Sequence, residues 1–323
     1  MSGSVKRAIV TGAGGFIGAN VARRLLDVGV HPFLLTAPGS SRWRLEELAA
    51  HAPIVEVDLA DTDGVARAAM DARADHVFHL AAHGAYSWQT DHASILRTNV
   101  IGTSNLLEAC LASGFEAFVN TGTSSEYGLK DHAPREDEPT DPNSTYAVSK
   151  TAATILCRQV AGRSDANVCT LRLYSAYGPW EEPKRLIPAL VVEGLHGQLP
   201  PLVDPTIARD FVWVGDVVDA YLAAASAIHD EPGAVYNVGT GVQTTIADAV
   251  KITREVLGID ALPRWGSMLP RAWDTSCWIA DSSKIRDRLG WQPTLDLKTG
   301  MTAYAEWLRA RPAVLAHYEE HRG

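Results

Sequence analysis

Tyr146 and Lys150 are four residues apart, so on a helix their side chains lie on the same face. A tyrosine hydroxyl has a pKa of about 10, and a neighbouring ammonium together with the positive charge of a bound cofactor lowers it. Such a tyrosine can exchange a proton near neutral pH, as hydride transfer at an oxygen-bearing carbon requires. The alternative is a surface tyrosine that packs on the lysine stem.

Thr123 lies in a hydroxyl-rich segment, TGTSSEYG, that occupies residues 121–128. The segment follows an apolar run, 117–120, which has the length of a buried strand. Ligands of open α/β folds bind at the carboxyl ends of parallel strands. We therefore expect these hydroxyls at the ligand-binding edge of a sheet.

A glycine motif, TGAGGFIG at residues 11–18, follows the first apolar run and opens a helical pattern. Gly12, Gly15 and Gly18 suit a tight turn, close approach of the backbone to a pyrophosphate, and close packing of helix on strand. An ordinary turn is the alternative. Asp58, with Leu59, ends the third run, where it could hold an adenine or cap a helix.

The elements that would position these residues alternate along the first half of the chain. Beyond about residue 175 prolines interrupt the pattern, and one more strand is expected at 235–238. We predict a doubly wound α/β fold, with a Rossmann domain of residues 1–175 to which 206–242 return. A smaller, partly interleaved substrate domain would comprise 176–205 and 243–323. The six strand-length runs are 7–10, 33–35, 54–57, 77–80, 117–120 and 168–171.

Taken together, the motifs resemble the extended short-chain dehydrogenase/reductase family, in its nucleotide-sugar epimerase, dehydratase and reductase branch. The resemblance covers nearly the whole chain. It rests on the glycine motif, HLAA at 79–82, Asn99, the trio of Thr123, Tyr146 and Lys150, and the segments LRLYSAYGP, RDFVWVGDVV and YNVGTG.

The resemblance implies that Tyr146 is the acid/base, that Lys150 binds the nicotinamide ribose and lowers the tyrosine pKa, and that Thr123 holds the sugar oxygen. It also implies a nucleotide-diphosphate sugar between the domains. Arg209 and Arg271 are candidate partners for its phosphates, although either could form a surface ion pair. Further implied cofactor contacts are Gly12, Gly15, Phe16, Ile17, Gly18, Asp58, Leu59, Leu80, Ala81, Ala82 and Asn99.

Several positions depart from the family pattern. Dehydratases of this branch carry an Asp-Glu pair, or a Glu, just after the threonine, where this chain has Ser124 and Ser125. Glu126 is displaced by one place, which on an extended segment points it to the opposite face, so dehydration is not expected. Ser175 stands where an asparagine often contacts the substrate. The side chains expected either to border the sugar or to pack together are His83, Tyr86 and Trp88.

The end of the second predicted strand bears on the choice of cofactor. NAD enzymes usually place an acid there for the ribose hydroxyls, but this chain has Leu-Thr-Ala at 35–37. Ser41, Arg42 and Arg44 follow, with side chains that could hold a 2′-phosphate, so NADP is favoured. The alternative is NAD bound without the usual carboxylate, with Trp43 over the adenine.

The choice between NADP and NAD bears on which reaction the chain is expected to catalyse. NADPH is exchangeable, so NADP favours a ketoreductase acting at C4 of a deoxysugar nucleotide. A 4-epimerase with retained NAD is the close alternative, since it uses the same trio. A nucleotide-binding regulator without activity is a third hypothesis, against which the complete trio argues.

Composition limits these hypotheses. The formal net charge of −9 at pH 7 argues against a nucleic-acid partner. No apolar run is long enough to span a bilayer, so we expect a cytoplasmic protein without a membrane partner. The spacing of the four cysteines fits neither zinc nor a redox motif, so no metal is expected. The family resemblance implies a homodimer.

Overall fold

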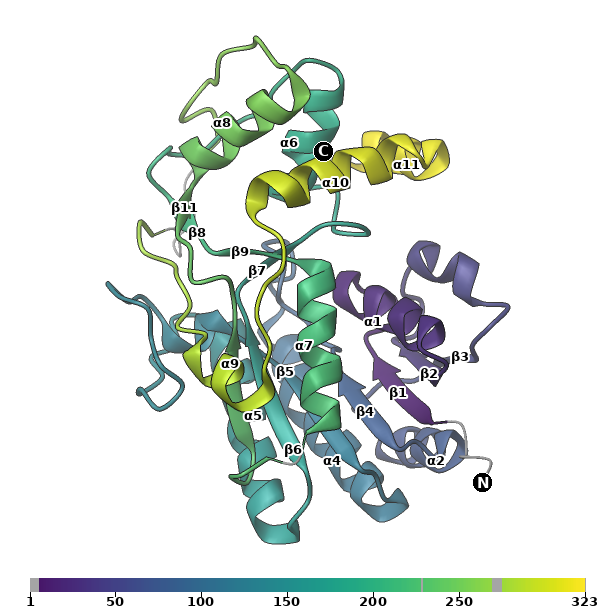
Figure 1. Ribbon diagram of the computed structural model, residues 1–323. Helices are drawn as coiled ribbons and strands as arrows, with labels where there is room; N and C mark the ends of the chain where they lie inside the picture. Colours follow the sequence, from purple (N-terminus) through teal and green to yellow (C-terminus); the bar gives the residue numbers. More distant parts are fainter. Residues whose placement is uncertain (1–5, 228, 269–274, 323) are drawn as a thin grey trace.

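The computed structural model describes residues 6–227, 229–268 and 275–322. Its centre is a parallel sheet of seven strands in the order β10-β6-β5-β4-β1-β2-β3 (Figure 1). This sheet confirms the predicted doubly wound α/β fold, and each predicted strand lies in it. The strands are β1 (Arg7–Thr11), β2 (His31–Thr36), β3 (Ile54–Glu56), β4 (His76–His79), β5 (Ala117–Thr123), β6 (Val168–Leu173) and β10 (Ala234–Val238).

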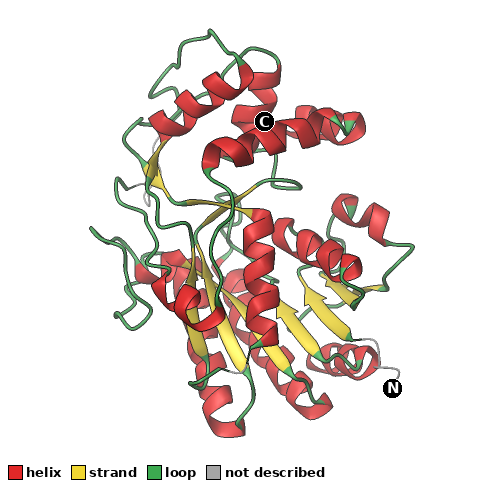
Figure 2. Ribbon diagram, viewed as in Figure 1, coloured by secondary structure: helices red, strands yellow, loops and turns green. Residues whose placement is uncertain are grey.

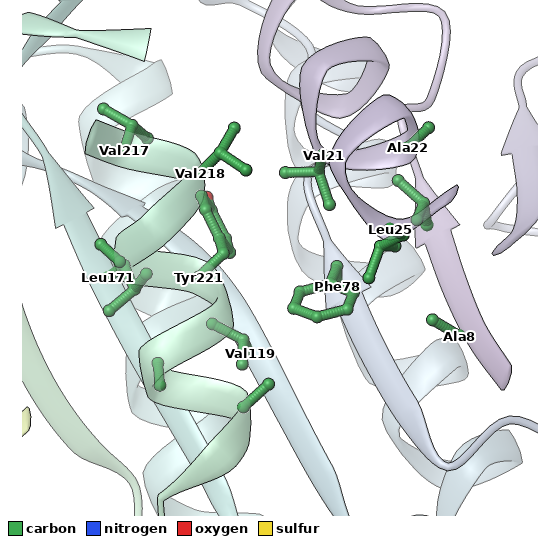
Figure 3. Packing of buried hydrophobic residues seen from close by; sticks show 14 of the residues in the cluster. Ala8, Val21, Ala22, Leu25, Phe78, Val119, Leu171, Val217, Val218 and Tyr221 are labelled. Atoms are coloured by element: carbon green, nitrogen blue, oxygen red, sulfur yellow. The ribbon is translucent and has the colours of Figure 1, made fainter. Parts of the chain in front are cut away.

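Helices cover both faces of the sheet (Figure 2). On one face, α1 (Phe16–Asp27) and α7 (Val214–Ser226) turn Leu25 and Tyr221 toward Phe78 of β4 (Figure 3). On the other face, α2 (Thr62–Ala72), α4 (Gly102–Ser113) and α5 (Thr145–Ser164) bury residues such as Leu106 and Cys157. With both faces covered, every residue of β6 is buried, including Thr170 and Arg172 between its apolar residues.

A second core cluster lies beyond one end of the strands, away from the N-terminus (Figure 1). It is enclosed by α6 (Leu186–Leu195), α8 (Ile246–Leu257), α10 (Leu297–Arg309) and α11 (Pro312–His321). Two short strand pairs connect it with the sheet. These are β7 (Ser175–Tyr177) with β9 (Phe211–Trp213), which is parallel, and β8 (Ala208–Arg209) with β11 (Thr244–Thr245), which is antiparallel.

Short helical segments complete the fold at the carboxyl ends of the strands and beside them. They are η1 (Trp43–Leu48), α3 (His92–Leu96), the π-helical η2 (Arg97–Ile101), η3 (Ser124–Tyr127) and α9 (Ser283–Leu289). Among the described residues, no helix is long and apolar enough to cross a membrane.

The chain leaves β1 toward β2 on one side of the sheet and later returns to β4 on the other side. Strand order therefore reverses between β1 and β4, and such a switch point opens a crevice at the carboxyl ends of the two strands. The loops that follow β1, β4 and β5 meet at this crevice.

Candidate active site

The glycine loop lies against the segment that follows β4. Gly12 has a φ of +63°, and a Cβ on it would come within 2.7 Å of the Ala81 Cα, so no other residue fits. Gly15 is the N-cap of α1 and donates its N–H to the Gly12 carbonyl at 2.9 Å. A Cβ on Gly18 would collide with the Gly12 carbonyl. The first N–H groups of α1, including those of Phe16 and Ile17, therefore stand at the crevice, where a pyrophosphate would fit.

A buried threonine and histidine fix the start of the loop after β4. The Thr11 hydroxyl accepts hydrogen bonds from the N–H groups of Leu80 and Ala81, each at 3.1 Å. It also lies 2.7 Å from Nδ1 of His79, while Nε2 of His79 lies 2.8 Å from the Thr103 hydroxyl. Burial lowers the pKa of His79 to about 3, so the ring is neutral. Neutral hydrogen bonds thus hold the HLAA segment against the end of β1, with Ala82 exposed at its end.

Tyr146 and Lys150 lie on α5, whose first turn is capped by Ser144: its hydroxyl accepts the Ala147 N–H at 3.2 Å. A hydrogen bond joins the side chains of Tyr146 and Thr123. Burial raises the pKa of Tyr146 to about 12. Burial is the largest cause of this rise, Glu126 adds to it, and the interaction with Thr123 and the Arg185 charge oppose it.

Lys150 is buried, and its Nζ has no hydrogen-bond partner among the described residues. Burial lowers the pKa of this ammonium. A buried donor without an acceptor is costly, so the site is built for a ligand that supplies oxygens. The ribose hydroxyls of a nicotinamide nucleotide meet that need, and the glycine loop offers its backbone to the same molecule. The residues present therefore fit a dinucleotide cofactor.

Asn99 links the loop after β4 to α5, the helix that carries Tyr146 and Lys150. Its amide donates to the His83 carbonyl and to the Ser149 hydroxyl, each at 2.8 Å, and its oxygen accepts the His83 N–H at 2.8 Å. Both amide hydrogens are therefore used within the protein. Because Ser149 precedes Lys150, this buried asparagine positions the lysine, and a direct cofactor contact by its side chain stays a prediction.

The segment after β5 is not extended, as the sequence interpretation assumed, but forms the 3₁₀ turn η3. Thr123 caps it by accepting the Ser125 N–H at 3.2 Å, and Oε1 of Glu126 accepts the Thr123 N–H at 3.0 Å. Ser124 is buried and Ser125 is partly buried. Glu126 is fully buried and is hydrogen-bonded within the protein. The two positions where dehydratases carry acids thus hold hydroxyls only.

Tyr86 and Trp88 stack on each other, with parallel rings whose centroids are 4.7 Å apart. The Gln89 side-chain oxygen holds their loop by accepting the N–H groups of Gly84 at 2.9 Å and Tyr86 at 3.3 Å. Burial raises the pKa of Tyr86, and Tyr86 in turn acts on the pKa of Tyr146. The pair therefore packs together near Tyr146, and a contact of Tyr86 with the sugar stays a prediction.

The residues after β2 do not all face the crevice. The Ser41 carbonyl would lie 3.1 Å from a Cβ on Gly14, so Ser41 borders the glycine loop. Arg42 is ion-paired with Glu56, at 2.5 Å. Arg44 is buried and donates to the carbonyls of Trp180 at 2.6 Å and Gly14 at 3.4 Å. The expectation that Arg44 holds a 2′-phosphate is therefore wrong, because its guanidinium is used inside the protein.

The structure also overturns two expectations for Trp43 and Asp58. Trp43 does not lie free for an adenine: its ring packs on His317 of α11, with centroids 4.1 Å apart and an angle of 31° between the ring planes. Asp58 does not cap α2, whose N-cap is Asp61. Asp58 instead accepts from Arg97 at 2.9 Å, while Leu59 is buried beside it.

The residues predicted to contact the phosphates and the sugar lie on different elements, and one of them lies outside the described residues. Ser175 begins β7 and donates its N–H to the Asp210 carbonyl at 2.9 Å, at the junction of the two core clusters. Arg209 lies on β8, with its guanidinium 5.7 Å from the Trp278 ring centroid. Arg271 lies outside the described residues.

Sequence reasoning missed Arg185, the N-cap residue of α6. Burial raises the pKa values of Tyr86 and Tyr146, and the Arg185 charge is among the groups that oppose both rises; its Nε lies 3.7 Å from the buried Glu181. A lone arginine after a proline-rich segment carries no spacing signal, so only the packing of α6 over the crevice reveals it.

Among the described residues, no group of three or more His, Cys, Asp or Glu side chains is arranged to hold a metal. The site is thus a dinucleotide crevice with a Thr-Tyr-Lys trio at its edge, which defines an oxidoreductase-type fold and site. Residues 8–239 match the model of the NAD dependent epimerase/dehydratase family, and the chain belongs to that family.

Relatives cover nearly the full length of the chain. A dTDP-glucose 4,6-dehydratase of Streptomyces griseus is 33% identical, with 93% of each chain covered. A UDP-glucose 4-epimerase of Mycolicibacterium smegmatis is 31% identical, over 94% of this chain and 98% of the relative. Among solved structures, MoeE5 in complex with UDP-glucose and NAD has a TM-score of 0.82 and 32% identity, covering 94% of this chain and 99% of its own. The same protein is known with UDP-glucuronic acid and NAD.

Proposed function

We propose that this chain is a nucleotide-sugar 4-epimerase that retains NAD and acts on a UDP-hexose or UDP-hexuronate. The observation that carries the proposal is the trio itself: Tyr146 is hydrogen-bonded to Thr123, and the buried Lys150 ammonium lacks a partner among the described residues at the switch point of the sheet. Support for the substrate class comes from relatives that are named as acting on, or are bound to, UDP-glucose and UDP-glucuronic acid.

The chain's own residues supply the proton chemistry. Tyr146, as phenolate, takes the proton of the sugar 4-hydroxyl while Thr123 holds the same oxygen. Bound NAD supplies the hydride acceptor and later the hydride donor, so that the C4–H bond is broken and re-formed without net oxidation. Tyr146 then returns its proton to the 4-oxygen. Because Tyr146 and Thr123 are fixed on α5 and β5, inversion requires that the 4-keto sugar present its opposite face before reduction.

The choice between NAD and NADP follows from the residues after β2. The sequence favoured NADP and a ketoreductase, and neither gains support from the comparisons, in which related structures hold NAD. Arg42, with Ser41 the remaining candidate for a 2′-phosphate, is already neutralised by Glu56, whose carboxylate would repel that phosphate. Both observations support the epimerase with retained NAD over an NADPH-consuming ketoreductase.

Dehydration is not proposed, although one relative is a dehydratase. Loss of water needs an acid and a base beside the sugar, and the positions after Thr123 hold Ser124 and Ser125. Glu126 does not replace them, because it is buried and bonded to Arg172.

The cofactor and substrate roles of the remaining residues are proposals as well. Residues 1–175 and 206–242 would bind NAD, and 176–205 with 243–323 would close over the nucleotide sugar. Arg209 and Arg271 are proposed to bind the diphosphate, with Ser175, His83 and Tyr86 near the sugar. The proposed cofactor contacts are Gly12, Gly15, Phe16, Ile17, Gly18, Ser41, Arg42, Asp58, Leu59, Leu80, Ala81, Ala82, Asn99, Tyr146 and Lys150.

We further propose that the chain forms a homodimer through the neighbouring helices α3, η2 and α5. The Thr145 hydroxyl lies 2.6 Å from Nδ1 of His92, which ties α3 to α5. Large apolar side chains are exposed on these helices, and such patches mark association surfaces. They are Leu96, Ile101, Val148 and Ile155.

Mass spectrometry of the small molecules released when the freshly purified protein is denatured tests the proposed cofactor. We expect NAD at close to one equivalent. NADP, or no nicotinamide nucleotide at all, would contradict retention of NAD.

A further inference from the structure

A buried carboxylate lies directly behind the catalytic trio. Glu126 is fully buried in η3, and the mechanism proposed above does not use it. Its Oε1 accepts the backbone N–H of Thr123 at 3.0 Å and the hydroxyl of Thr154 at 3.1 Å. Thr154 lies one helical turn after Lys150 on α5. One carboxylate oxygen thus joins the residue that holds the sugar oxygen to the helix that carries the catalytic pair.

The other carboxylate oxygen is held by Arg172 of β6. Nε of Arg172 donates to Oε2 of Glu126 at 3.0 Å, and the guanidinium lies 4.5 Å from the Tyr127 ring centroid. Burial lowers the pKa of Arg172, but Glu126 and Tyr127 together raise it by more, so the pKa of the guanidinium is raised. Burial raises the pKa of Glu126, while the Arg172 charge and the hydrogen bonds from Thr123 and Thr154 oppose that rise by binding the ionised carboxylate.

Space around the carboxylate is restricted, so its position is fixed. A Cβ on Gly122 would lie 2.6 Å from Oε1 of Glu126, which leaves glycine as the fitting residue at that place in β5. Glu126 and Thr123 also form a reciprocal cap, in which each side chain bonds the backbone of η3. The turn that orients Thr123 therefore cannot relax without moving the carboxylate.

We propose that Glu126 is a positioning residue of the active site: its buried carboxylate fixes the backbone of Thr123 against α5 and places a negative charge directly behind the trio. The proposal rests on the proposed hydride-transfer chemistry of Tyr146. The Glu126 carboxylate is the negative charge next to the trio. The compensating Arg172 is bonded to Oε2, the carboxylate oxygen that does not contact Thr123. We therefore expect the Glu126 charge to affect the pKa values of Tyr146 and Lys150 more than the Arg172 charge does.

The electrostatic consequence follows from the groups around the pair. Burial is the first cause of both shifts, raising the pKa of Tyr146 and lowering that of Lys150, and the Glu126 charge acts to raise both pKa values. Removing both charges of the ion pair should therefore lower both pKa values. Other titratable groups interact with Tyr146 or Lys150, and they come from several elements: Tyr86 after β4, Arg185 before α6, His79 of β4, Tyr221 of α7 and Cys157 of α5.

The test separates charge from structure with the double variant E126Q/R172Q. Removing one partner alone leaves a buried unpaired charge and strongly destabilises a fold, so the single E126Q variant need not fold. In the double variant the new amide oxygen at position 126 can still accept from Thr123 and Thr154, and its NH₂ group can donate to the amide oxygen introduced at position 172. The variant E126D, which keeps the carboxylate, is the matched control.

The measurement is the ultraviolet phenolate titration of Tyr146 in the NAD-saturated protein, obtained by subtracting the titration of the same protein carrying Y146F. We expect the midpoint to fall by about one pH unit in E126Q/R172Q and to stay at the wild-type value in E126D. The affinity for NAD should be unchanged. Equal midpoints in the wild type and the double variant, or no Tyr146 titration in either, would overturn the proposal.

This readout needs no substrate. If the sugar proposed above is wrong, the titration still reports on Glu126. If the titration shifts as expected while no nucleotide sugar is epimerised, the positioning role stands and the proposed function fails.

Discussion

Arg42 and Glu56 form an ion pair beside the glycine loop, with Nη2 of the arginine 2.5 Å from Oε1 of the carboxylate. The sequence shows the arginine as a cation after the second strand, where a 2′-phosphate would bind. Because Glu56 ends β3 and β3 pairs with β2, the fold places an acid next to that cation. The position that favours NADP by sequence is therefore electrically neutral in the structure.

The first prediction concerns this pair. E56Q should increase the affinity for NADP by about tenfold, the scale of one charge-assisted hydrogen bond, because it frees Arg42 and removes a repelling charge. The affinity for NAD should change little. Isothermal titration of the cofactor-stripped protein measures both affinities.

The control is the double variant E56Q/R42A, in which the gain for NADP should disappear. A gain that persists without Arg42, or an equal gain for NAD, would show that these two residues do not border the ribose.

The second prediction concerns the acid/base. Y146F should keep the fold and the affinity for NAD but lose about 10²- to 10⁴-fold in turnover, the usual contribution of a positioned acid/base. Steady-state kinetics with circular dichroism as the folding control measures this. Turnover close to that of the wild type would remove Tyr146 from the mechanism.

Much of this site can be predicted from sequence, because its signals are local. Gly12, Gly15 and Gly18 follow a strand and open a helix, and Tyr146 and Lys150 share a helix face, so spacing together with position in the chain predicts them. The strand runs are also local, since strands covered on both faces are apolar throughout.

What the sequence does not show depends on contacts between distant segments. Arg44 has the same charge as Arg42 two residues earlier, yet it is buried against Trp180, which comes from after β7. Glu126 was interpreted by strand geometry, but Thr123 caps a 3₁₀ turn, and the partner Arg172 lies on another strand. Neither the burial of Arg44 nor the contacts of Glu126 can be predicted from the local pattern of apolar and polar residues.

The third prediction concerns stability and pH. Burial raises the pKa of Glu181 from its ordinary 4.5 to about 8, with Arg185 opposing this, and Oε2 of Glu181 has no hydrogen-bond partner among the described residues. The native state therefore holds a proton that the unfolded chain has lost between these pH values. The free energy of unfolding should fall as pH rises from about 4.5 to about 8, by at most about 1.4 kcal/mol per pH unit from this group.

Urea unfolding of the wild type and E181Q at mildly acidic and mildly alkaline pH, both between those two pKa values, checks this. The decrease in stability between the two conditions should be smaller in E181Q, because glutamine cannot lose a proton. Equal decreases in the two proteins would mean that Glu181 titrates normally in the fold.

The fourth prediction concerns assembly. I155D places a charge in the exposed apolar face of α5, so it should convert the proposed homodimer to monomer while leaving the monomer folded, since Ile155 is exposed. Sedimentation velocity measures the change. The matched control is M70D, a charge at another exposed apolar residue, on α2, which should leave the dimer intact. A wild type that sediments as a monomer would contradict the proposed surface.

Proton NMR of UDP-glucose and of UDP-glucuronic acid incubated with the purified protein, with no cofactor added, tests the central claim most directly. The account predicts that at least one of them is converted to its C4 epimer, that no 4-keto-6-deoxy sugar forms, and that Y146F abolishes the conversion. The account would be contradicted if a 4-keto-6-deoxy product appeared. It would equally be contradicted if both sugars were unchanged while a 4-keto-6-deoxy nucleotide sugar was reduced with one NADPH consumed per sugar.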